Sequence, residues 1–99
     1  HQLLHMEISK LFGNIKRRRR KRLFLYLLND DKNSFNYVLE ALTTYVPMCN
    51  SLRAEQIAMI AHNTGQCCIY SGFAPEIYFI YAHLQKNGLQ VQVRDTNQN

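Results

Sequence analysis

The apolar run Leu23–Leu28, followed directly by Asn29-Asp30-Asp31, constrains the fold of this chain more than any other feature. Six consecutive apolar or aromatic residues without helical periodicity are typical of a strand with both faces covered, which predicts the middle strand of a sheet. Asn and Asp close turns because their side chains bond nearby backbone groups. We therefore expect the fold to be built around residues 23–28.

Apolar residues recur at helical spacing in two stretches after this turn, and a third helical stretch is expected between Pro75 and Gly88. Each stretch ends at a residue that stops helices, because Pro47 cannot continue one and because Gly65 and Gly88 readily adopt the left-handed terminating conformation. Pro75 suits the first turn of the last stretch. The expected helices cover residues 35–46, 51–64 and 75–87.

Two further strands are predicted, a short one at Gln66–Ser71 and a half-buried one at Leu89–Arg94, where apolar and polar residues alternate. The order β-α-α-β-α-β predicts an α+β fold with a three-stranded antiparallel sheet packed against helices. We divide the chain into a basic flexible N-terminal arm (1–22), one folded domain (23–95) and a frayed tail (96–99).

Positive charge is concentrated before the first strand. Residues 1–22 hold eight of the twelve Lys and Arg residues and one acid, whereas residues 23–99 hold four basic residues against six acids. The basic run consists of Lys16, Arg17, Arg18, Arg19, Arg20, Lys21 and Arg22. Like charges repel, so we expect a solvated arm, either without a fixed partner or with an acidic or nucleic-acid partner. The alternative function is therefore a small basic RNA- or nucleic-acid-associated protein of ribosomal type.

Cysteine usage and the lengths of apolar segments exclude several classes of protein. The cysteines Cys49, Cys67 and Cys68 are odd in number and include two neighbours that cannot easily bridge each other, so we expect reduced thiols in a cytoplasmic protein. Leu23–Leu28 is far shorter than the ~20 residues of a membrane-spanning helix, so no membrane insertion is expected. No nucleophile–base set or metal-ligand spacing is visible, so we expect no enzymatic activity, no metal and no cofactor.

The turn and His62 together suggest a site for an ammonium group. Taken singly, Asn29-Asp30-Asp31 is an ordinary turn, and a histidine near a helix C-terminus often only bonds the last carbonyls. An α-ammonium group has three donors, and the Asn29 carbonyl, the Asp30 carboxylate and a neutral His62 nitrogen would supply acceptors. The apolar strand before the turn and Phe35 after it would place these acceptors at the rim of a hydrophobic hollow.

These same residues resemble the ClpS adaptors of the Clp protease. The resemblance covers about Leu23 to Val93 and rests on the strand and turn at 27–31, the helix at 35–42, the segment 54–62 followed by Gly65, and the closing segment 81–89. It implies a β-α-α-β-α-β fold and a non-enzymatic, cytoplasmic, bacterial-type adaptor. Such adaptors bind free N-termini that begin with a bulky hydrophobic residue (an N-degron) and deliver the substrate to the N-domain of a AAA+ Clp unfoldase.

Carried over by position, the resemblance assigns roles to individual residues. Asn29, Asp30 and His62 would hold the α-amino group, and Glu76 would contact the unfoldase. The side-chain pocket would be lined or rimmed by Leu28, Asn33, Phe35, Val38, Ala58, Ala61 and Leu89.

The sequence departs from the family pattern at the pocket and at the third helix. Phe35 and Ala58 stand where the family usually has methionines, so we expect an apolar pocket with an altered preference among Leu, Phe and Tyr. The third helix carries Tyr78, Phe79 and Tyr81 where polar or basic residues are usual, and it is shorter.

Overall fold

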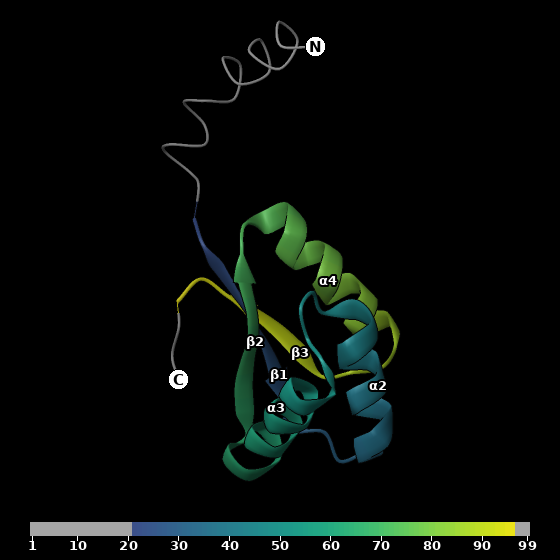
Figure 1. Ribbon diagram of the computed structural model, residues 1–99. Coiled ribbons are helices and arrows are strands. Elements are labelled where there is room, and N and C mark those ends of the chain that lie inside the picture. The colour runs from purple at the N-terminus through teal and green to yellow at the C-terminus, as the bar shows by residue number, and fades with distance from the viewer. Residues whose placement is uncertain (1–20, 97–99) are drawn as a thin grey trace, which may run out of the picture.

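The computed structural model describes residues 21–96 (Figure 1). The predicted element order β-α-α-β-α-β is confirmed. The elements are β1 (Leu23–Leu28), α2 (Phe35–Tyr45), α3 (Ser51–Thr64), β2 (Gln66–Gly72), α4 (Ala74–Lys86) and β3 (Val91–Arg94).

The three strands form an antiparallel sheet in the order β2-β1-β3. The apolar strand β1 is therefore central, as predicted, and it pairs along its length with both neighbours. Leu27, for example, lies opposite Cys67 on β2 and Val91 on β3. The register with β2 shifts between Leu25 and Tyr26, which marks a β-bulge in that ladder.

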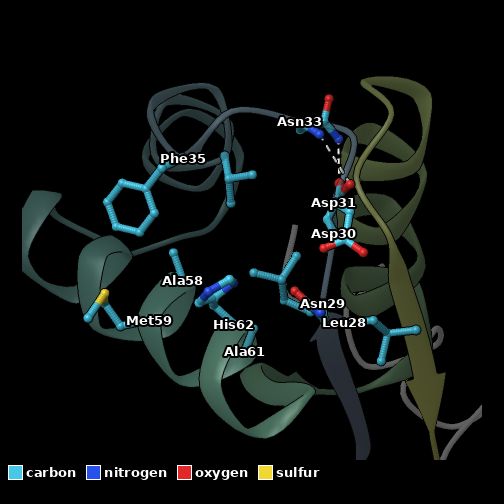
Figure 2. A pocket seen from close by; sticks show the side chains of 12 residues that line it. Leu28, Asn29, Asp30, Asp31, Asn33, Phe35, Ala58, Met59, Ala61 and His62 are labelled. Carbon is cyan, nitrogen blue, oxygen red and sulfur yellow. Dashed lines mark hydrogen bonds between the residues drawn. The ribbon is translucent and has the colours of Figure 1, made fainter.

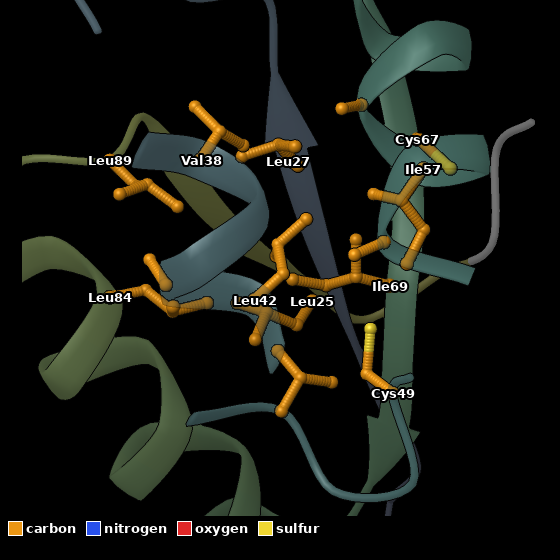
Figure 3. Close-up of a cluster of buried hydrophobic side chains, with 14 of the residues drawn as sticks. Leu25, Leu27, Val38, Leu42, Cys49, Ile57, Cys67, Ile69, Leu84 and Leu89 are labelled. Atoms are coloured by element: carbon orange, nitrogen blue, oxygen red, sulfur yellow. The ribbon is translucent and has the colours of Figure 1, made fainter. Parts of the chain in front are cut away.

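The core lies between the sheet and all three helices (Figure 3). Leu25 and Leu27 of β1 contribute from the sheet side, and their neighbours on the same strand point to the opposite face, because successive residues of a strand alternate. Cys67 is buried and Cys68 is partly exposed, as expected for adjacent strand positions, and both thiols are free. The helices supply Val38, Ala41, Leu42, Ala54, Ile57, Ala58, Ala61, Ile77, Ile80 and Leu84.

Local sequence signals account for most of the helix ends. Ser34 caps α2 by accepting a hydrogen bond from the Tyr37 N–H (3.1 Å), and Asn50 caps α3 by accepting one from the Arg53 N–H (2.9 Å). Gly65 ends α3 in the left-handed region with φ of 96°. Such a φ strains any residue with a Cβ, which explains glycine at this position.

The predicted final strand was too long at its N-terminal end. Leu89 precedes β3, and its N–H donates to the carbonyl of Leu84 on α4 (3.1 Å), so this residue still belongs to the exit of that helix. Its side chain is only 4% exposed and lies in the core. Alternation of residue types alone does not reveal a helix-terminating hydrogen bond of this kind.

Most of the predicted basic arm, residues 1–20, and the tail residues 97–99 lie outside the described residues. At the edge of the described part, Lys21 forms an exposed ion pair with Asp95 (3.7 Å). Arg22 donates a hydrogen bond to Ser71 (3.1 Å) and places its guanidinium 5.3 Å from the centre of the Phe73 ring. None of the helices within residues 21–96 is long and apolar enough to cross a membrane.

Candidate functional site

The turn after β1 is held by the carboxylate of Asp30. One carboxylate oxygen accepts hydrogen bonds from the backbone N–H groups of Lys32 (2.8 Å) and Asn33 (3.2 Å). The other oxygen accepts a hydrogen bond from the side-chain amide of Asn33. This is the local bonding that makes Asp a turn residue, and it fixes the direction of the Asp30 side chain.

These contacts also favour the ionised form of Asp30. Burial raises the pKa of its carboxyl group, but the Asn33 side chain, the two backbone N–H groups and the charge of Lys32 together lower it below the ordinary value of 3.8. Asp30 therefore carries a negative charge at neutral pH, and it can attract a cation placed beside the turn.

Asn33 connects this turn to the loop that follows α4. Its amide donates to the Asp30 carboxylate and also to the carbonyl of Gly88 (2.9 Å). One helical turn later, the hydroxyl of Tyr37 donates to the carbonyl of Asn87 (2.7 Å). The turn is thus bonded to a segment more than fifty residues away in the sequence, which limits its movement.

A second backbone contact connects the turn to the end of α3. The Asn29 N–H donates to the carbonyl of Gly65 (3.0 Å), the residue that terminates this helix. His62 lies in the last turn of the same helix. The contact therefore places Asn29 and His62 close to each other although they are far apart in the sequence (Figure 2).

A hollow of about 410 Å³ lies between the turn, the start of α2 and one face of α3 (Figure 2). This volume is within the range of about 300–1,000 Å³ typical of sites for small ligands. The hollow is lined by Leu27, Leu28, Asn29, Asp30, Asp31, Asn33, Phe35, Val38, Ala58, Met59, Ala61 and His62.

The lining is divided into a polar end and an apolar end. In Figure 2, the Asn29–Asp31 turn lies on one side, Phe35 and Met59 lie on the other, and Ala58 and His62 lie between them. Phe35 is 45% exposed, so its ring stands at the rim and does not fill the hollow. The arrangement can hold a molecule that is cationic at one end and apolar at the other.

All of the residues predicted for the amine site and the pocket line this hollow, with the exception of Leu89. Leu89 is buried in the core and contributes no lining surface. Sequence reasoning missed Leu27 and Met59, and it named Asp31 in the turn without giving it a role of its own. Met59 could have been found from its position three residues before His62, because residues at this spacing share one face of a helix.

The predicted docking residue Glu76 is separate from this hollow. It lies exposed in the first turn of α4, where its carboxylate accepts a hydrogen bond from the hydroxyl of Tyr70 (2.7 Å). This bond, together with burial and the charge of Glu76, raises the pKa of Tyr70. The other carboxylate oxygen lies over Gly72, where an added Cβ would be only 2.7 Å away, so Gly72 leaves room for Glu76.

The part of the chain that the structure describes contains no cluster of three or more His, Cys, Asp or Glu side chains that could hold a metal ion.

The family model of the "ATP-dependent Clp protease adaptor protein ClpS" matches residues 18–92 of this chain. The ClpS adapter protein of Thermosynechococcus vestitus is 32% identical over 63 residues, which cover 64% of this chain and 67% of the relative.

A solved structure supports the fold. The structure of Agrobacterium tumefaciens ClpS2 bound to L-phenylalaninamide matches with a TM-score of 0.70 at 19% identity, and the match covers 79% of this chain and 100% of that one. At this level of identity the likeness concerns the fold alone.

Proposed function

The chain belongs to the ClpS family of ATP-dependent Clp protease adaptors, and on this basis we propose that it binds substrate N-termini whose first residue is bulky and hydrophobic. In this proposal the bound substrate is delivered to a AAA+ Clp unfoldase and its protease. The chain itself acts by binding and cleaves nothing.

One observation carries the proposal: Asn29 and Asp30 line the polar end of a hollow whose opposite wall is apolar, and His62 lines it between the two. A protein N-terminus presents the matching pair of groups, an ammonium group with three donors and, two bonds away, the first side chain. The ligand named for the Agrobacterium structure, L-phenylalaninamide, combines the same two groups.

The hydrogen bonds within the turn suggest different roles for Asp30, Asn29 and His62 in binding the ammonium group. Because both oxygens of Asp30 already accept hydrogen bonds from the turn, we propose that Asp30 contributes mainly a fixed negative charge. Asn29 is exposed and donates its N–H to the end of α3, and we propose that its side-chain oxygen and a neutral His62 nitrogen contact the ammonium group directly.

The free energies expected from burying the first side chain and binding the amine are close to those of micromolar affinity. Burying one Leu or Phe side chain contributes about 1.5–3 kcal/mol, and each charge-assisted hydrogen bond adds about 1.5–3 kcal/mol before ordering costs. Micromolar affinity corresponds to about −8 kcal/mol. One residue and its amine therefore nearly suffice, and loss of the amine should remove most of the binding.

The test is a titration of a fluorescent peptide with a free N-terminal Phe against the same peptide acetylated at its N-terminus. We expect acetylation to weaken binding by about tenfold or more, since at least one charge-assisted bond is lost. Asp30→Ala should have a similar effect, and Asp95→Ala, which removes the same charge outside the hollow, should have little. Equal binding of the two peptides by the unmodified protein would refute the proposal.

Delivery to the unfoldase needs a second surface, and we propose Glu76 for it. Its exposure and the hydrogen bond from Tyr70 leave the carboxylate accessible in a fixed direction. We also propose that the basic run contacts an acidic surface of the unfoldase or the substrate. Deleting residues 1–20 should then reduce the salt dependence of the assembled complex.

A further inference from the structure

Met59 occupies a position in the hollow that distinguishes it from the other exposed apolar residues of α3. It is 51% exposed and lines the hollow, whereas its neighbour Ile60 is 46% exposed and does not. In Figure 2, Met59 and Phe35 both lie across the hollow from the Asn29–Asp31 turn, Met59 on α3 and Phe35 at the start of α2.

Between the turn and the Phe35–Met59 side lie His62 and two small residues of α3. Ala58 and Ala61 are buried in α3 on the side that faces the hollow. Ala58 and Ala61 fill less of the hollow than larger apolar side chains would, and a ligand anchored at the turn reaches Phe35 and Met59 only by extending across the hollow.

Leucine and the aromatic side chains differ in how far they reach. A phenyl, phenol or indole ring extends further from its α-carbon than an isobutyl group does. When the amine is held at the turn, an aromatic ring extends further toward the Phe35 ring and the Met59 sulfur than an isobutyl group does, so it would gain more contacts with these wall atoms. Aromatic pairs and sulfur–aromatic contacts both add stabilisation beyond simple burial.

We propose that this hollow selects N-terminal Phe, Tyr or Trp over Leu, and that Met59 is a specificity-determining residue that acts together with Phe35. The inference rests on the proposed function, because it assumes that the amine is held at the turn. It narrows the substrate class to N-termini that begin with an aromatic residue.

The experiment uses two peptide sequences that differ only at the first residue, which is Phe or Leu. Each sequence is made with a free and with an acetylated N-terminus, which gives four peptides. Binding is measured for the wild type, Met59→Ala, Met59→Leu and the matched control Ile60→Ala. We expect the free Phe peptide to bind about tenfold more tightly than the free Leu peptide to the wild type, the size of one favourable aromatic contact. This ratio should fall to about threefold in Met59→Ala, take an intermediate value in Met59→Leu and remain unchanged in Ile60→Ala.

The ratio of the affinities for the free Phe and free Leu peptides is compared, because a general loss of stability would weaken the binding of both peptides equally. The inference is overturned if the wild type binds the two free peptides equally, if Met59→Ala keeps the wild-type ratio, or if Ile60→Ala lowers the ratio as much as Met59→Ala does. These results differ from failure of the proposed function, in which acetylation would change the binding of neither peptide. That last result would overturn both proposals.

Discussion

Substitution of Asn33 by alanine tests whether the turn is held by its connection to the loop after α4. The wild-type amide donates to the Asp30 carboxylate and to the Gly88 carbonyl (2.9 Å), and Asn33→Ala removes both hydrogen bonds. A hydrogen bond to a charged group contributes about 1.5–3 kcal/mol and a neutral one about 0.5–1.5 kcal/mol.

The lower ends of these ranges apply, because Gly88 is exposed and water can replace the lost donors. We therefore expect Asn33→Ala to lower the free energy of unfolding by about 2 kcal/mol. With a urea m value of about 1–2 kcal/mol per molar, the midpoint of unfolding should fall by roughly 1–2 M at an unchanged slope. Asn36→Ala is the matched control, since Asn36 lies exposed on α2 and makes no side-chain hydrogen bond to any residue between 21 and 96 in the structure.

A second measurement follows the carboxyl group directly. Burial raises the pKa of Asp30, and the Asn33 amide is the largest of the contributions that lower it. In Asn33→Ala the pKa of Asp30 should rise relative to the wild type, which an NMR titration of this carboxyl group would detect. If neither the urea midpoint nor the Asp30 titration changes, the amide does not hold the turn and the reasoning is wrong.

Two further predictions concern the same turn and the end of α3. Because the pKa of Asp30 is lowered on folding, ionised Asp30 stabilises the fold above its ordinary pKa of 3.8, and this stabilisation is lost as the pH falls through the lower value in the folded state. Asp30→Asn should therefore have a lower free energy of unfolding in urea than the wild type at pH 7. The difference between the two free energies should shrink below about pH 4, and a difference that stays constant with pH would contradict this. Gly65→Ala meets no atom within 4 Å but places a Cβ at φ of 96°, so it should cost about 1–2 kcal/mol of strain in the same assay. Gly88→Ala, at φ of 87° and also in open space, should cost about as much, and a neutral effect at both positions would exclude backbone strain as the reason for these glycines.

The fold was predictable to a large extent because its signals are local. An apolar run without helical spacing needs cover on both faces, and β1 is indeed the central strand. Gly65 and Gly88 end their helices because a left-handed residue is required there, whatever the rest of the chain does. The turn after β1 was likewise recognisable because Asp30 bonds the nearby backbone groups of Lys32 and Asn33.

The residues of the candidate site were predictable where they belong to a turn or a helix end that the local sequence identifies. The turn residues Asn29 and Asp30 follow the strand directly, and the position of His62 near a helix end follows from Gly65. That these groups line one hollow is a result of tertiary packing, in which the Asn29 N–H donates to the Gly65 carbonyl across segments far apart in the sequence. The resemblance to a family anticipated this proximity; residue patterns alone suggested it only as a hypothesis.

The amino-acid sequence by itself determined the element order, the central strand, the helix ends and the chemistry of the turn, because periodicity and backbone preference act over a few residues. Tertiary structure alone decided that Leu89 packs in the core and that Asn33 bonds Gly88. Each of these outcomes depends on the rotation and position of one element against another, which is set by packing between segments distant along the chain.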